Sequence, residues 1–151
     1  LALTLLLGAL DAVRETVQTR AVPVLLGLVS RDSYIEQQLG AYPLIMRRLN
    51  DLPPGARVRL MWEPRTYLCP VVCKGDLLFD HWARALRQEQ TPAAVFAAWR
   101  EMDDYLLVYD AGYDFWRADE RLAAENARFP VALAEFMTPV WTEGGYTLYG
   151  W

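Results

Sequence analysis

The sequence lacks most of the residues and motifs on which catalytic and nucleotide-binding sites depend. It has one histidine and two cysteines, too few for a recognisable zinc pattern, so no metal site is expected. No serine lies in a nucleophile-elbow pattern, which argues against a Ser-His-Asp hydrolase. No glycine-rich fingerprint follows either main predicted strand, which argues against dinucleotide or P-loop phosphate binding. The sequence also contains no internal repeat and no low-complexity segment.

Positive charge is also sparse. The 15 Lys and Arg are outnumbered by 19 Asp and Glu, for a net charge of −4, and they form no basic block. Nucleic acid is therefore not an expected partner. The chain is instead rich in apolar residues, at 54%, with six Trp and eight Tyr. Its 151 residues fit one domain, and we expect most of the large aromatic side chains in its core.

The first ten residues carry no charge, and Asp11 is the first charged residue. Ten helical residues span about 15 Å, half of a hydrocarbon core of about 30 Å. We interpret residues 1–20 as the end of a transmembrane helix and a juxtamembrane helix, and residues 21–151 as an extracytoplasmic α/β domain. This stub predicts contact with membrane lipid and with a remaining transmembrane part of the same chain. The alternatives are a signal-peptide core, which no A-x-A pattern follows, and a buried N-terminal helix.

The order of the predicted elements indicates an α/β fold. A leading helical region ends before the turn at Pro53-Pro54-Gly55, and a βαβαβ order follows. Right-handed crossovers then predict a small Rossmann-like three-layer αβα domain with a short, mostly parallel, three-stranded sheet. The elements expected after the turn are strand 56–62, helices 77–88 and 91–102, strand 105–109, a helical stretch 115–138 interrupted at Pro130, and strand 146–151.

Cys69 and Cys73 lie in the loop expected at residues 67–76. In an extracytoplasmic domain their Cys-x3-Cys spacing favours a disulfide across a tight loop, whose stabilisation is on the order of 2 kcal/mol. Free thiols, or a metal or redox pair with neighbouring Asp76 and His81, are the alternatives.

One cluster of polar and aromatic residues follows the predicted strands. In open parallel sheets, ligands bind at the carboxyl ends of the strands, and there this cluster could hold a sugar or a phosphate-bearing group. The structural alternative, which we favour, is an ion pair between Glu63 and Arg65 with Asp114 capping a helix. The candidate ligand-binding residues are Glu63, Arg65, Tyr67, Asp110, Tyr113 and Asp114.

Four segments give the chain a family resemblance. They read GLVSRDSY at 27–34, LGAY at 39–42, LPPGARV at 52–58 and WEPRTYLC at 62–69. Together with the apolar stub, they resemble the C-terminal soluble region of bacterial multi-pass glycosyltransferases of the family 39 type, relatives of protein O-mannosyltransferases. The resemblance covers nearly the whole chain.

The resemblance implies that the parent protein is a GT-C enzyme, which passes a sugar from a polyprenyl-phosphate donor to an acceptor outside the membrane. In that family the catalytic acid lies in an early extracytoplasmic loop that has no counterpart here, so no catalytic residue is carried over. The fragment itself is expected to hold no cofactor, although it could contact glycan or lipid-linked sugar. The competing hypotheses are a free-standing secreted or tethered glycan-binding module, and a small enzyme that uses Glu63 and Asp110 as an acid and base pair.

Overall fold

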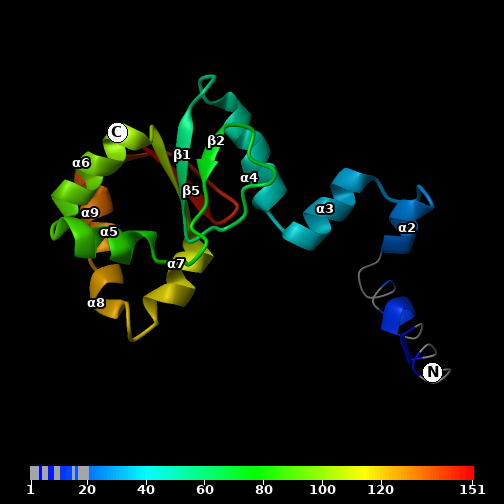
Figure 1. The fold of residues 1–151 in the computed structure, drawn as a ribbon. Helices are drawn as coiled ribbons and strands as arrows, with labels where there is room; N and C mark the ends of the chain where they lie inside the picture. Colours follow the sequence, from blue (N-terminus) through cyan, green and yellow to red (C-terminus); the bar gives the residue numbers. More distant parts are fainter. Residues whose placement is uncertain (1–3, 5–6, 9–10, 15, 17–20) are drawn as a thin grey trace. The chain divides into compact units, whose positions relative to one another are not determined.

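The computed structural model describes residues 4, 7–8, 11–14, 16 and 21–151, and Figure 1 shows its fold. This described part contains eight α-helices, one 3-10 helix and a five-stranded sheet. The chain divides into two compact units, Leu1–Leu44 and Ile45–Trp151. Among the described residues, no helix has the length and apolar character needed to cross a membrane. The membrane-helix end predicted at residues 1–20 lies largely outside the described residues and stays a prediction.

The first unit contains two helices, α2 (Ala21–Leu25) and α3 (Arg31–Leu39). Ser30 caps α3 as expected, because its Oγ accepts a hydrogen bond from the backbone N–H of Ser33 at 3.1 Å. The leading helical region then breaks at Gly40, whose φ of 62° favours glycine. The break therefore precedes Pro43, which lies in the first turn of the next helix, α4 (Tyr42–Arg48), where proline is tolerated.

The second unit is built on a mixed sheet with the strand order β2-β1-β3-β5-β4. β1 pairs in parallel with both β2 and β3, whereas β5 pairs antiparallel with β3 and β4. In the centre, Leu60, Leu107 and Leu148 lie in register and are fully buried. The strands are β1 (Arg57–Met61), β2 (Val72–Lys74), β3 (Tyr105–Tyr109), β4 (Thr138–Glu143) and β5 (Tyr146–Gly150).

The prediction of a three-stranded, mostly parallel sheet is therefore wrong. The additional strands, β2 and β4, lie at the two edges of the sheet, where their side chains are largely exposed and show no apolar alternation. β4 also contains Pro139, which an edge strand tolerates. The final strand is β5, and its tight connection to β4 through Gly144 and Gly145 makes the pair antiparallel.

Helices cover the sheet on both faces of the second unit. The aromatic side chains of Trp82, Phe96, Trp99 and Phe129 form the core on one face. Ile45, Met46 and Leu49, from the end of α4 and the 3-10 helix Leu49–Asp51, are also fully buried. Figure 1 shows α5, α6 and α9 on one side of the sheet and α4 on the other. The remaining helices are α5 (His81–Glu89), α6 (Pro92–Met102), α7 (Asp110–Arg117), α8 (Ala123–Asn126) and α9 (Phe129–Phe136).

The helix that starts after Thr91 is confirmed, since the Thr91 hydroxyl accepts from the N–H of Ala94 at 3.3 Å. The helix predicted at 77–88 instead begins at His81, and residues 77–80 form a loop. The long helical stretch predicted at 115–138 is divided among α7, α8 and α9, followed by β4.

A buried ion cluster joins the strands to the end of α6. The carboxylate of Asp103 is fully buried and lies 2.6 Å from Nη2 of Arg59 and 2.9 Å from Nζ of Lys74. The Arg59 guanidinium also lies over the ring of Trp99, 4.7 Å from its centroid. The indole N–H of Trp151 donates to the Asp103 carbonyl at 2.8 Å. This cluster holds β1, β2, α6 and the residue after β5 together.

Candidate functional site

The candidate residues from the sequence lie after the carboxyl ends of β1 and β3. Glu63, Arg65 and Tyr67 follow β1, and Asp110 to Asp114 form the first part of α7, which starts directly after β3. This placement agrees with the expected position of a ligand site in a parallel sheet. The contacts of each side chain then show what it can do.

Glu63 is fully buried, and both oxygens of its carboxylate are occupied. Oε1 accepts hydrogen bonds from the backbone N–H and the Nε of Arg65, at 2.9 and 2.7 Å. Oε2 accepts from Nη2 of Arg65 and from the hydroxyl of Tyr146, both at 2.6 Å. The Glu63–Arg65 ion pair that we favoured is present, and its bidentate geometry is the strong form of such a pair.

Tyr146, the first residue of β5, completes this network and was missed by the sequence analysis. Burial, and then its hydrogen bond to Glu63, raises the pKa of Tyr146, which therefore stays protonated as a donor. The hydrogen bonds to Glu63 likewise raise the pKa of Arg65. The only sequence signal was that Tyr146 opens a strand, and the antiparallel register that places it opposite Tyr109 could not be predicted.

The other candidates make different contacts. Tyr67 is 62% exposed, and its charge is a minor cause of the raised pKa of Arg65, after the hydrogen bonds to Glu63. The Tyr113 hydroxyl donates to the carbonyl of Asn126 at 3.2 Å, and its ring packs edge-on against Trp62. Burial, and then the charge of Asp114, raises the pKa of Asp110. The proposed role of Asp114 as a helix cap is wrong, since it lies inside α7, 3.5 Å from Arg117.

A second buried carboxylate, Asp76, organises the turn between β2 and α5. Its Oδ2 accepts from the backbone N–H of Trp62 at 3.2 Å. Its Oδ1 accepts from the N–H groups of Asp80 and His81, at 3.1 and 3.3 Å. Burial raises the pKa of Asp76. One fully buried side chain thus joins the end of β1 to the start of α5 and holds the loop 77–80 between them.

The backbone around Asp76 is tightly packed. Trp62 and Phe79 adopt φ values of 57° and 56°, which side chains other than glycine rarely take. A Cβ added to Gly112 would lie 2.6 Å from the carbonyl oxygen of Trp62, so only glycine fits there. The sequence analysis noted Asp76 only as a neighbour of the cysteines and missed this role, because nothing local to Gly75-Asp76 indicates a contact with Trp62.

His81 lies beside Asp76, with its Nε2 3.9 Å from the carboxylate Oδ1. Burial lowers the pKa of His81, although the Asp76 charge acts in the opposite direction. Within the described part of the chain, no group of three or more His, Cys, Asp or Glu could hold a metal ion. The pair is therefore best described as a packed contact at the start of α5.

Cys69 and Cys73 form a disulfide, with their Cα atoms 6.3 Å apart. This is the first of the alternatives considered for the pair. Cys73 lies in the middle of β2. The disulfide therefore links this edge strand to the loop that precedes it.

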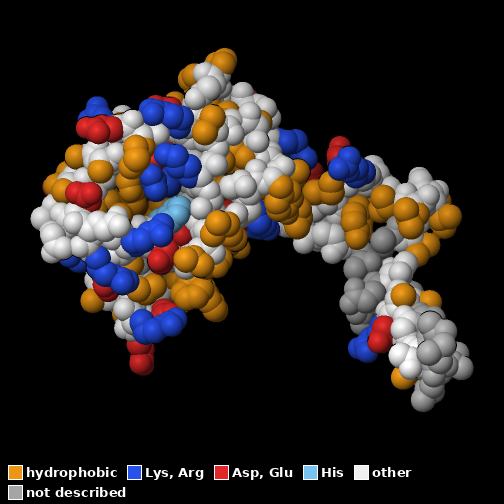
Figure 2. Space-filling model, viewed as in Figure 1, with side chains coloured by type: hydrophobic (Ala, Val, Ile, Leu, Met, Phe, Trp, Pro, Cys, Tyr) orange, Lys and Arg blue, Asp and Glu red, His pale blue; other side chains and the backbone are white. Residues whose placement is uncertain are grey.

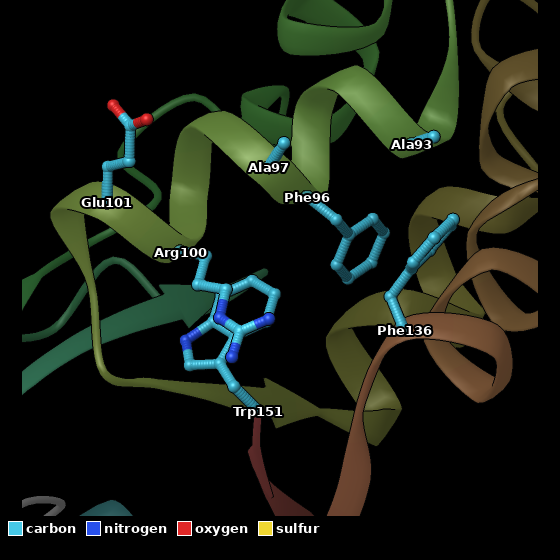
Figure 3. A pocket seen from close by; sticks show the side chains of 7 residues that line it. All are labelled: Ala93, Phe96, Ala97, Arg100, Glu101, Phe136 and Trp151. Carbon is cyan, nitrogen blue, oxygen red and sulfur yellow. The ribbon is translucent and has the colours of Figure 1, made fainter.

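A cavity of about 490 Å³ lies away from the strand ends, between α6, α9 and Trp151. Figure 3 shows the rings of Phe96 and Phe136 beside each other, Arg100 directed toward Trp151, and Glu101 pointing away from the rings. The rings of Phe96 and Phe136 are stacked with centroids 5.2 Å apart, and Trp151 lies edge-on to Phe96. The sequence analysis did not predict this cavity, because its walls come from three distant segments. They are lined by Ala93, Phe96, Ala97, Arg100, Glu101, Phe136 and Trp151.

Comparison of the chain with protein-family models, with curated proteins and with solved structures found no match.

Proposed function

We propose that the chain is the C-terminal extracytoplasmic accessory domain of an integral-membrane glycosyltransferase, which moves a sugar from a polyprenyl-phosphate donor to an acceptor. Three features support the proposal: the resemblance carried by segments 27–34, 39–42, 52–58 and 62–69, the uncharged residues 1–10, and the Cys69–Cys73 disulfide. Disulfides persist in oxidising compartments, as expected for a domain on the outer side of a membrane.

The Glu63–Arg65–Tyr146 network carries the accessory role. A general acid or base needs a carboxyl group that can reach the substrate and exchange a proton with it. Glu63 is fully buried and accepts four hydrogen bonds from its own chain, so its geometry serves the fold. Asp110, the proposed second member of an acid and base pair, sits in the first turn of α7. The contacts of Glu63 favour a domain that supports the parent enzyme over one that carries out the transfer through this carboxylate.

In this proposal the domain is a modified Rossmann-like αβα unit without the phosphate-binding turn. Its short parallel part is extended by the antiparallel strands β5 and β4. The domain would act as a lid, as an acceptor-docking surface or as a stabilising module. The sugar donor would be bound by the membrane part, and the accessory domain would lie outside the membrane.

A glycan-binding module without catalysis is the second candidate, and the cavity beside Trp151 favours it. Aromatic faces next to an arginine suit the apolar face and the hydroxyl groups of a sugar ring. Glycan-array binding by the chain, lost in Trp151→Ala and Phe136→Ala but kept in Tyr67→Ala, would support this candidate. An array without signal would dismiss it.

The reading frame upstream of residue 1 tests the main proposal. We expect it to encode about eight or more apolar spans of about twenty residues each, continuous with this chain. A start codon within about thirty residues of Leu1 would leave no room for a membrane enzyme and would overturn the proposal.

A further inference from the structure

Three large apolar side chains project into solvent near the carboxyl ends of the parallel strands. Leu77 and Leu78, in the loop between β2 and α5, are 72% and 70% exposed, and Phe115 on α7 is 72% exposed. The loop and the helix are joined behind them by Phe79, whose ring stacks on Trp116 with centroids 5.3 Å apart. Trp116 in turn contacts Phe115 edge-on. We call these five residues the apolar edge.

The loop that carries the two leucines is held in a defined shape. The buried carboxylate of Asp76 accepts from the backbone of Asp80 and His81, the residues that directly follow the loop's exposed part. Phe79 adopts a φ of 56°, a conformation that is costly for a phenylalanine. The arrangement places Phe79 against Trp116 and leaves Leu77 and Leu78 in solvent.

The surroundings of the apolar edge are polar and include several cations. Figure 2 shows hydrophobic side chains gathered over α7 and the loop before α5, with basic and acidic side chains beside them. Arg84, in the first turns of α5, is exposed. Arg117 and Arg121 are 60% and 81% exposed, and both also contact aspartates, Asp114 and Asp119. Projecting aliphatic and aromatic groups with arginines around them match the acyl and phosphate layers of a membrane surface.

We propose that the apolar edge binds a lipid bilayer at its interface, with Leu77, Leu78 and Phe115 entering the headgroup and acyl boundary. A protein partner would require complementary shape, whereas a fluid bilayer accepts projecting side chains of any outline. Arg84 complements anionic headgroups, whereas the charges of Arg117 and Arg121 are partly neutralised by Asp114 and Asp119. This inference rests on the membrane attachment proposed above, to which it adds an orientation: the carboxyl ends of β1 and β3 face the membrane.

Hydrogen exchange measured by peptide tests the inference on the complete chain. Vesicles of phosphatidylcholine with phosphatidylglycerol are the probe, and pure phosphatidylcholine vesicles report the contribution of charge. With accessible lipid at about ten times the dissociation constant, exchange in residues 76–81 and 113–117 should slow about tenfold. Because peptides are read separately, binding through residues 1–20 is distinguished from binding through the apolar edge.

Matched variants separate the apolar edge from general apolar contact. Leu77→Asn/Leu78→Asn should abolish the slowing at 76–81 and 113–117. Val131→Asn/Val140→Asn changes two exposed apolar residues outside the apolar edge, 71% and 53% exposed, and should leave the slowing of exchange intact. Arg84→Gln should weaken binding about fivefold to anionic vesicles and leave binding to pure phosphatidylcholine unchanged.

Equal protection in Leu77→Asn/Leu78→Asn and the unaltered chain, or no protection in either, would overturn the inference. So would slowing that depends on protein concentration without vesicles, which would mean that a second copy covers the edge. In each of these cases the upstream reading frame still decides the proposed function. Conversely, if the apolar edge is protected by vesicles but no membrane spans are encoded upstream, the lipid-binding inference stands and the proposed function falls.

Discussion

The two ends of the parallel strands both contain ion pairs, but they differ in the side chains that are exposed beyond those pairs. At the amino ends, Arg57 pairs with Asp104, and Arg59 and Lys74 pair with the buried Asp103. At the carboxyl ends, Glu63 and Arg65 are just as fully paired, but the surface beyond them is formed by Leu77, Leu78 and Phe115. Ionic groups hold the fold together at both ends, and at the carboxyl end three large apolar side chains are exposed beyond them. Of the candidate ligand-binding residues, Glu63, Arg65 and Tyr113 make hydrogen bonds within the fold.

Breaking the amino-end cluster should have the largest effect. Asp103→Asn removes the negative charge between Arg59 and Lys74, and Arg59 remains nearly buried without a carboxylate. We expect the free energy of unfolding to fall by about 3–5 kcal/mol, measured by urea unfolding. Asp104→Asn is the matched control: its carboxylate is 42% exposed, so the loss should be far smaller. Equal losses would show that the burial of Asp103 does not determine its contribution to stability.

Removing one hydroxyl tests the carboxyl-end network. Tyr146→Phe deletes the donor to Glu63 and keeps the ring that stacks on Tyr109. A hydrogen bond to a charged group contributes about 1.5–3 kcal/mol, and we expect a loss of that size in urea unfolding. Tyr109→Phe serves as the control, because Tyr109 stacks on the same ring and is not among the donors to the Glu63 carboxylate. If the two variants were equally stable, the Glu63 network would not need Tyr146.

The disulfide should contribute less, because the loop it closes is short. Cys69→Ser/Cys73→Ser should lower the free energy of unfolding by about 2 kcal/mol. The same loss should follow when the unaltered chain is treated with reductant, and reductant should have no effect on the double variant. If reductant did not change the stability of the unaltered chain, the disulfide would be absent or would not contribute to stability.

The smallest effect concerns pH. Burial lowers the pKa of His81 in the folded state, so the unfolded chain binds the proton more readily. The contribution of His81 to stability should therefore rise as pH increases through the interval below the unfolded value of about 6.5, whereas the raised pKa of Asp76 contributes a slope of the opposite sign. The urea midpoint measured across this interval should show the slope, and His81→Gln should flatten it. A slope of the same size in His81→Gln would assign the titration to another group.

Elements were predicted correctly where a few neighbouring residues determine the local structure. The apolar run Tyr105–Tyr109 is β3 with the predicted bounds, and Thr91-Pro92 starts α6. The sequence analysis failed at β2 and β4 because edge strands are exposed and carry little alternation, and β2 has only three residues. It placed Trp62 in the first strand, whereas β1 ends at Met61 and the backbone N–H of Trp62 donates to Asp76, across a connection that includes β2.

Within the candidate site, the same limit applies. The Glu63–Arg65 pair could be predicted because the two residues lie two positions apart in one turn. Tyr146 reaches them from 83 positions beyond Glu63, through an antiparallel register that no local pattern reveals. The apolar edge likewise depends on Phe79 meeting Trp116, and the sequence placed both in helices rather than at a loop–helix contact.

The rate of sugar transfer by membranes that contain the complete parent protein tests the central claim, that this domain supports the enzyme without carrying its chemistry. Asp110→Asn, introduced into that protein, is the decisive variant, with the urea midpoint of the isolated chain confirming that the domain still folds. We predict a transfer rate from a polyprenyl-phosphate sugar within about twofold of the unaltered protein. A loss of about 100-fold or more in a folded variant is the size expected for a missing general acid or base, and it would place the chemistry in this domain.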